Sequence, residues 1–242
     1  MAETLTVKIF RLNPKEDKAP RFDVYKLEKQ PRMTVLDVLF YIQNYLDGSL
    51  AFRSCCRAAV CGSCAMHING MYRLACRTQV STLGKEIIIR PLSHLKILKD
   101  LITDMTPFWE KYKYIKPYLM PGSPPEDKNK ERYQKAYDQE KLIGLIDCIL
   151  CGACYGACPI TLSSKNYLGP AALLKAYRFV VDTRDKALEE RLLLVGEENG
   201  VWRCHTVFNC QKVCPKSLDP TGAIGALKRE ILTRKAGLIF VG

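Results

Sequence analysis

The first residues that could do chemistry are four cysteines followed by a proline. Cys148, Cys151, Cys154 and Cys158 stand before Pro159 with the spacing C-x2-C-x2-C-x3-C-P. Thiolates are the usual ligands of iron–sulfur clusters. In this spacing the first three cysteines hold a [4Fe-4S] cluster, and the fourth holds a neighbouring cluster. The chain contains twelve cysteines, so ligands for further clusters are available elsewhere.

A second cysteine run repeats this frame with one gap. Cys204, Cys210 and Cys214 stand before Pro215, and Val207 occupies the position where another cysteine would fall. Valine has no atom that can bind iron, so one corner of that cluster lacks a protein ligand. The exchange of fourth cysteines between the runs then predicts two ligand sets. These are Cys148, Cys151, Cys154 and Cys214 for a [4Fe-4S] cluster, and Cys158, Cys204 and Cys210 for a [3Fe-4S] cluster.

Nearer the N-terminus a third run has a different spacing. Cys56, Cys61 and Cys64 form C-x4-C-x2-C, the plant-type [2Fe-2S] spacing, which requires one more distant cysteine. Cys76 is the only cysteine between this run and the next, so we expect it to be the fourth ligand. Cys55 is left over. It would lengthen the spacing by one residue, and we interpret it as a small free thiol.

Structural zinc and disulfide bonds are the alternatives for these cysteines. Zinc sites usually pair two C-x2-C knuckles, and neither the overlapping run over 148–158 nor the run over 56–64 has that form. Disulfides require an oxidising compartment, and the first residues lack the apolar core of a secretory leader. Three iron–sulfur clusters are therefore the expected metal centres.

Composition narrows the function classes further. The 242 residues include 37 Lys and Arg against 25 Asp and Glu, a formal net charge of +12. The basic residues are scattered and form no basic helix, so nucleic acid is not an expected partner. Charged residues interrupt every apolar run before it reaches the length of a membrane span. The chain has no dinucleotide-binding or nucleophile motif, so we expect it to carry electrons between partners that hold the substrate sites.

The first hundred residues predict a small mixed sheet that positions the [2Fe-2S] ligands. Apolar and polar residues alternate in half-buried strands, and Asn69 followed by Gly70 predicts a hairpin turn. A helical period over 34–45 places Thr34 at the N-cap. Strands are expected over 5–12, 22–27 and 86–91.

From about His94 onward the pattern becomes helical. Leu95, Leu98, Leu101, Ile102 and Met105 are spaced for one face of a helix, and further helices are expected over 169–181, 186–195 and 220–235. The predicted fold class is α+β. A β-grasp domain of the plant-type [2Fe-2S] ferredoxin kind over residues 1–105 precedes an all-α, bacterial-ferredoxin-like domain over residues 106–242, which holds the two larger clusters.

With these residues in place, the chain resembles the iron–sulfur subunit of the succinate dehydrogenase/fumarate reductase family, the succinate:quinone oxidoreductases. The resemblance extends over nearly the whole length. It rests on the segments 53–64, 100–105, 148–154, 169–172 and 204–216. It implies a subunit that passes electrons from FAD through [2Fe-2S], [4Fe-4S] and [3Fe-4S] clusters to quinone, or in reverse.

The resemblance also implies partners. A flavoprotein subunit with covalent FAD would dock near the [2Fe-2S] domain, and a membrane anchor with quinone and haem b would lie below the [3Fe-4S] cluster. The chain would then be peripheral, on the cytoplasmic side of the cell membrane. Many family members have a Trp at the quinone site between the Cys-Pro and Gly-Pro pairs, but residues 160–167 contain none. We therefore expect an anchor haem to receive the electrons, with Pro159 and His205 as the nearest residues of this chain.

Three other functions are open at this point. A free-standing multicluster ferredoxin would be purified alone, and an iron–sulfur subunit of another fumarate-linked reductase would contain a fused cysteine-rich module, which this sequence lacks. A nucleic-acid-binding metalloprotein would bind DNA or RNA in a strongly salt-dependent way. Purification from membranes together with a flavoprotein would separate the succinate:quinone oxidoreductase function from all three.

Overall fold

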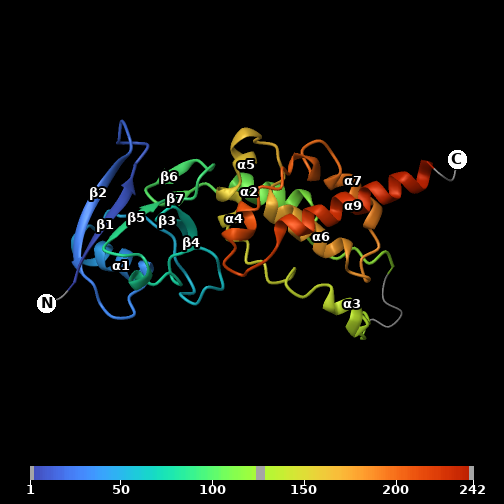
Figure 1. The fold of residues 1–242 in the computed structure, drawn as a ribbon, viewed down its shortest axis with the longest axis horizontal. Helices are drawn as coiled ribbons and strands as arrows, with labels where there is room; N and C mark the ends of the chain where they lie inside the picture. Colours follow the sequence, from blue (N-terminus) through green and yellow to red (C-terminus); the bar gives the residue numbers. More distant parts are fainter. Residues whose placement is uncertain (1–2, 124–128, 240–242) are drawn as a thin grey trace. The chain divides into compact units, whose positions relative to one another are not determined.

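The computed structural model describes residues 3–123 and 129–239 (Figure 1). The chain forms two compact units, each assembled from several stretches of sequence. The first contains Met1–Pro107, Ile149–Ala157 and Val213–Pro215, and the second contains Phe108–Cys148, Cys158–Lys212 and Lys216–Gly242. The first unit therefore includes two short cysteine-bearing segments that the sequence pattern assigns to the C-terminal domain.

The first unit is built on a five-stranded mixed sheet with the order β2-β1-β5-β3-β4. β1 pairs antiparallel with β2 and parallel with β5, whereas β3 pairs antiparallel with β4 and β5. Every second residue of β1 is buried, which is the period of a strand with one face on a core. The expected strands and the hairpin are thus confirmed. They are β1 (Thr4–Arg11), β2 (Arg21–Glu28), β3 (Ala65–Ile68), β4 (Met71–Leu74) and β5 (Glu86–Arg90).

One helix, α1 (Val35–Tyr41), packs its apolar face on this sheet. Its first turn is held by a capping box at Thr34, the expected N-cap. The Thr34 hydroxyl accepts a hydrogen bond from the Asp37 N–H at 3.2 Å, and the Asp37 carboxylate accepts one from the Thr34 N–H at 2.9 Å. The helix then widens into a π-helical turn, η1 (Ile42–Leu46), and ends near the expected residue.

The prediction of a helix after residue 94 is wrong. This segment forms a small two-stranded sheet of β6 (Ile97–Lys99) and β7 (Ile102–Thr103). Asp100 between the two strands has φ 48°, in the left-handed region that no α-helix contains. The spacing of the apolar residues in this segment is helical, but its backbone is not.

The reason for this difference is a buried polar contact. The Asp100 carboxylate is buried and accepts hydrogen bonds from the N–H groups of Leu12 and Ala51, at 3.1 and 3.0 Å. It also pairs with the buried Arg11 guanidinium, whose Nε lies 3.1 Å away. A buried carboxylate needs such partners, and these come from the end of β1 and from the loop before Cys56. Long-range contacts therefore override the local periodicity.

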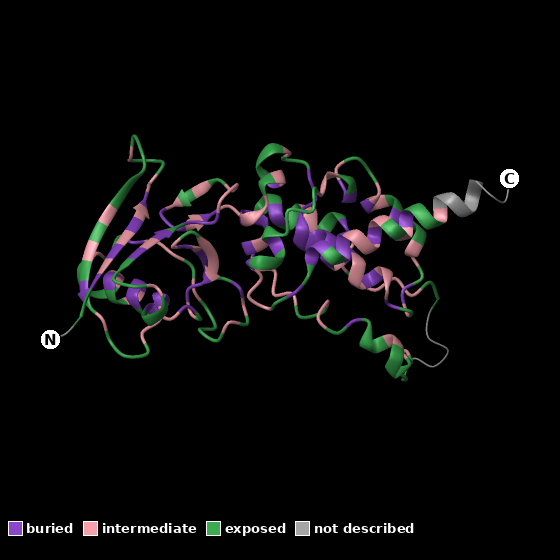
Figure 2. Ribbon diagram, viewed as in Figure 1, coloured by how far each residue is buried: buried purple, intermediate pink, exposed green. Residues whose placement is uncertain are grey.

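The second unit is helical, and its core lies among α6, α7 and α9. In Figure 2 α6 is mostly buried, whereas β2 of the first unit is mostly exposed or half-buried. The helices expected over 169–181, 186–195 and 220–235 are confirmed, as is the α+β class. The remaining α-helices and 3-10 turns of the chain are α2 (Thr106–Tyr114), α3 (Ala136–Glu140), α4 (Ala153–Ala157), α5 (Pro159–Ser163), α6 (Pro170–Val180), α7 (Leu188–Val195), α8 (Asn209–Lys212), α9 (Pro220–Ile239), η2 (Val80–Thr82) and η3 (Val201–Arg203). Of these, α4, η2 and the first two residues of α2 lie in the first unit. Within residues 3–123 and 129–239, none of the helices has the length and apolar character to cross a membrane.

Candidate metal centres

The Cys56 thiol lies at the centre of the loop between η1 and β3. Its Sγ accepts hydrogen bonds from three backbone N–H groups, at 3.3–3.4 Å. The donors are Ala58, Val60 and Cys61. Arg57 and Ala59 have φ of 55° and 56°, and such left-handed residues turn successive N–H groups to one side of the chain. The loop therefore directs three backbone donors at this one sulfur.

The other three cysteines of this site lie next to one another. Hydrogen bonds, above all from the backbone N–H of Cys56 and also from Ser63, lower the pKa of Cys61 to about 6. Burial raises the pKa of Cys64 to about 12, and the neighbouring Cys76 and Cys61 add to this effect. A backbone hydrogen bond of 3.0 Å, from the Ala75 N–H to the Cys64 carbonyl, places Cys76 beside Cys64. All four predicted ligands are thus brought together, and Cys55 stays at the exposed edge.

The run that begins at Cys148 is divided between the two units. Cys151, Cys154 and Cys214 belong to the first unit and Cys148 to the second. All four thiols are half-buried. Within the run, Leu150 and Gly152 adopt left-handed φ values of 53° and 79°. The backbone of this run thus turns sharply on both sides of its second cysteine.

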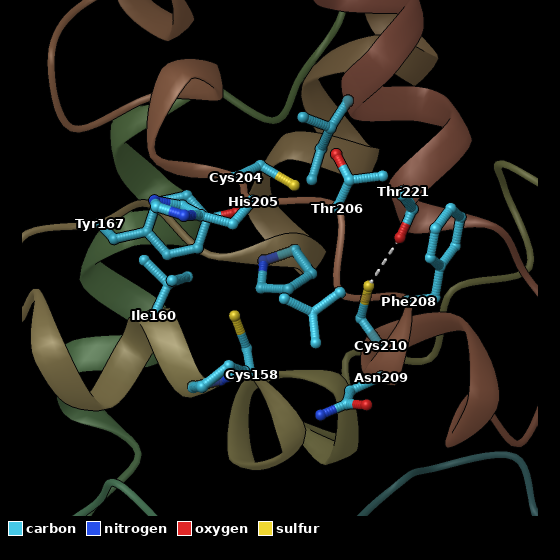
Figure 3. A pocket seen from close by; sticks show the side chains of 14 residues that line it. Cys158, Ile160, Tyr167, Cys204, His205, Thr206, Phe208, Asn209, Cys210 and Thr221 are labelled. Carbon is cyan, nitrogen blue, oxygen red and sulfur yellow. Dashed lines mark hydrogen bonds between the residues drawn. The ribbon is translucent and has the colours of Figure 1, made fainter.

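The remaining three predicted ligands line one pocket of the second unit (Figure 3). Its empty volume is about 320 Å³ and it opens to solvent. Cys158, Cys204 and Cys210 point into it from three different segments. Burial, followed by the nearness of the other thiols, raises the pKa of Cys158 and of Cys210. An iron cluster bound here would supply the positive charge that stabilises these thiols as thiolates.

Val207 also lines this pocket, on the loop between Cys204 and α8. The residues on either side of it, Thr206 and Phe208, have left-handed φ values of 56° and 63°. They stand two and four residues after Cys204, the same steps at which the first run is left-handed after Cys148. Val207 therefore occupies the loop position of Cys151 without its thiol.

Three polar side chains that sequence patterns did not indicate also lie next to these cysteines. The buried Thr221 places its hydroxyl 3.2 Å from Cys210 Sγ. Lys228 donates from Nζ to the Cys204 carbonyl at 2.9 Å. Tyr167 is fully buried beside Cys204, and burial followed by the three nearby thiols raises its pKa. Thr221 and Lys228 lie on α9, far along the chain, so no spacing rule could have linked them to the cysteines.

Pro159 and His205, the two residues expected nearest an electron acceptor, both line the same pocket. Pro159 is the first residue of α5, directly after the N-cap Cys158. His205 follows Cys204 and is exposed. The other two histidines lie in the first unit. His67 is in β3, whereas His94 precedes the two-stranded sheet and not a helix.

The donor atoms in these sites suit iron–sulfur clusters. Among the described residues, no three His, Cys, Asp or Glu side chains gather around a point where a single metal ion could bind. Cluster ligands do not surround a single point, because they bind several iron atoms, one cysteine to each iron in a cubane-type cluster and two to each iron in a [2Fe-2S] cluster. The amides directed at Cys56 and the hydroxyl directed at Cys210 are donors of the kind that stabilise cluster sulfurs.

Comparison with known proteins gives two domain matches and a full-length structural match. A family model described as a 2Fe-2S iron-sulfur cluster binding domain matches residues 6–110. One described as a 4Fe-4S dicluster domain matches residues 144–218. A chain of the Mycobacterium smegmatis Sdh1 complex in the apo form is similar with a TM-score of 0.88 and 26% identity, covering 98% of each chain.

A second solved structure shares the fold. It is a crystal structure of a hypothetical protein from Helicobacter pylori, with a TM-score of 0.59 and 20% identity; the match covers 94% of this chain and 40% of that one. The two domain matches confirm the [2Fe-2S] and [4Fe-4S] types expected from the cysteine spacing. The chain is therefore an iron–sulfur electron-transfer subunit that joins a 2Fe-2S domain to a 4Fe-4S dicluster domain, and over its full length it resembles a chain of a succinate dehydrogenase (Sdh) complex.

Proposed function

We propose that this chain is the electron-transfer subunit of a membrane-bound succinate dehydrogenase or quinol:fumarate reductase. It relays electrons between FAD of a flavoprotein subunit and quinone or haem of a membrane anchor. The three clusters supply one-electron carriers when bound. The observation that carries this proposal is the loop around Val207, which has the left-handed turns of the Cys148 run but lacks its second thiol.

The proposed ligand sets follow from this loop and from the exchange of fourth cysteines. Two groupings of cysteines support the assignment. Three predicted ligands line one pocket, and four others lie together at the Cys56 loop. The sets are Cys56, Cys61, Cys64 and Cys76 for [2Fe-2S]; Cys148, Cys151, Cys154 and Cys214 for [4Fe-4S]; and Cys158, Cys204 and Cys210 for [3Fe-4S]. Amide and hydroxyl donors on their sulfurs then help to set the reduction potentials.

The partners and location are part of the same proposal. The similarity to a chain of an Sdh1 complex supports a multisubunit assembly. We propose a flavoprotein with covalent FAD on the [2Fe-2S] side and a membrane anchor with haem b and quinone near the three-cysteine pocket. The chain is then held at the cytoplasmic face of the cell membrane. Pro159 and His205, at the rim of that pocket, are the residues nearest the anchor's acceptor.

Low-temperature electron paramagnetic resonance (EPR) with iron analysis tests this proposal. The anaerobically prepared complex is expected to give a [3Fe-4S] signal when oxidised, a [2Fe-2S] signal on reduction and about nine irons per chain. About ten irons without a three-iron signal would contradict the ligand set around Val207. Purification of the chain alone, with no flavoprotein in the membrane fraction, would contradict the proposed assembly.

A further inference from the structure

The loop that holds Cys61 and Cys64 makes an unusually close contact with the Cys148 run, inside the first unit. A β-carbon at Gly62 would lie 2.8 Å from both Cα and Cβ of Cys151, and 3.0 Å from the Ile149 carbonyl oxygen. Ordinary contacts of a β-carbon begin at about 3.4 Å. No residue other than glycine fits here unless the two loops move apart. The backbone of one cluster loop therefore rests directly on a ligand of the other.

A second contact joins the same two ligand sets. The Arg77 guanidinium, next to Cys76, donates to the Pro215 carbonyl at 2.8 Å, and Pro215 follows Cys214. All of these residues belong to the first unit. Residues adjacent to two proposed [2Fe-2S] ligands thus contact Cys151 and Pro215, and Pro215 is the neighbour of Cys214.

We propose that Gly62 is a positioning residue for electron transfer between these two sites, and that Arg77 supports it. The inference rests on the ligand sets proposed above. One electron passes from the reduced site to the oxidised site. The first site is oxidised by one electron and the second is reduced by one electron, and no bond is broken and no proton moves. Electron tunnelling weakens exponentially with distance, so the missing side chain at position 62 keeps the two sites in electronic contact.

The test compares side chains of increasing size at Gly62 in the full chain, loaded with its clusters and reduced with dithionite. The readout is the magnetic interaction between the two reduced clusters, seen as broadening and faster relaxation of their EPR signals. We expect a partial loss of this interaction in Gly62→Ala and a greater loss in Gly62→Leu. If Gly62 only stabilised the fold, without setting the distance between the two sites, its variants would leave this magnetic interaction unchanged.

Gly84 and Gly70 provide matched controls. Both have left-handed φ values, +80° and +81°, close to +74° at Gly62, but a β-carbon at either position would meet nothing within 4 Å. Gly84→Ala and Gly84→Leu therefore introduce the same backbone strain without a wedge between the loops. The interaction is expected to be unchanged in these variants. An equal loss at Gly84 would overturn the proposal, because backbone strain would then account for the effect.

An unchanged interaction in Gly62→Leu, with both clusters present by iron analysis, would also overturn the proposal. If position 62 variants lose a cluster, Arg77→Met decides, because this side chain is exposed and is not itself a proposed cluster ligand. It is expected to weaken the interaction, whereas Arg77→Lys, which keeps the charge, should weaken it less. No effect of Arg77→Met would overturn the inference. Absence of both signals in the unsubstituted protein would instead refute the proposed function.

Discussion

The run that starts at Cys148 and the run that starts at Cys204 have the same backbone turns but different side chains at them. Each is left-handed two and four residues after its first cysteine. Those residues are Leu150 and Gly152 in one run, and Thr206 and Phe208 in the other. Between them stands a cysteine in the first run and a valine in the second.

This comparison shows that loop shape and ligand count are separate properties. Only one of the four left-handed residues is a glycine, and a β-branched or aromatic residue in this region costs about 1–3 kcal/mol. The second run keeps the shape with Thr206 and Phe208, so its surroundings must hold it there. The backbone of the second run thus has the shape of the Cys148 run, whereas Val207 provides no thiol at the position of Cys151.

Introducing the missing thiol into the second run should have the largest effect, because it removes the difference between the two runs. Val207→Cys places a thiolate at the loop position of Cys151, so we expect conversion of the three-iron site to a four-iron site. Iron analysis should rise from about nine to about ten per chain, and the oxidised EPR signal should disappear. Val207→Ala, which adds no ligand, should keep the three-iron signal. Persistence of that signal in Val207→Cys would show that the two loops are not equivalent.

The next effect concerns the one glycine among the four residues. A β-carbon at Gly152 would lie 3.0 Å from Met105 Cε and 3.2 Å from Leu92 Cδ1, in addition to the left-handed strain. We expect Gly152→Ala to destabilise the protein by about 2 kcal/mol, or about 4–8 °C in thermal unfolding followed by circular dichroism. Gly144→Ala has a similar φ and open space around it, so it should lose only the strain contribution. Equal shifts in the two variants would disprove the packing part of this argument.

The second run has a hydroxyl, that of Thr221, next to one of its cysteines, and we expect this hydroxyl to change the reduction potential of the site. A donor on Cys210 Sγ stabilises the more negative, reduced state. A difference of about 1 kcal/mol between the two oxidation states equals about 40 mV, so Thr221→Val should lower the midpoint potential of the three-iron site by that order. Redox titration followed by EPR measures this shift. Thr221→Ser keeps the hydroxyl and should leave the potential near its original value; a similar drop in both variants would exclude the hydrogen bond as its cause.

The smallest expected effect comes from relieving strain in the second run. Phe208 is 53% exposed, so replacing it removes only a small area of buried apolar surface. Glycine, in addition, adopts the left-handed region freely. Phe208→Gly is therefore expected to stabilise the protein by up to about 1 kcal/mol in thermal unfolding. The neighbouring Val207 has no positive φ, so Val207→Gly should destabilise instead. A loss of stability in Phe208→Gly would mean that the ring makes a contact that outweighs the strain.

Much of the fold was predictable because its signals are local. The alternation in β1, the pair of Asn69 and Gly70 in the hairpin and the Thr34 capping box each depend on a few neighbouring residues. The segment after His94 was predicted wrongly because its conformation depends on Asp100, whose partners Arg11 and Ala51 lie far away in sequence. A periodicity argument cannot detect a buried carboxylate that is satisfied by distant groups.

The sequence by itself determined the number and spacing of the thiols, and with them the expected cluster types, because ligand spacing is a property of a short stretch of chain. Tertiary structure alone decided that segment 149–157 packs with the β-sheet unit, that Gly62 touches Cys151 and that Thr221 reaches Cys210. These contacts join residues that are 11 to 89 positions apart. They exist only once packing has brought distant segments within a few ångströms.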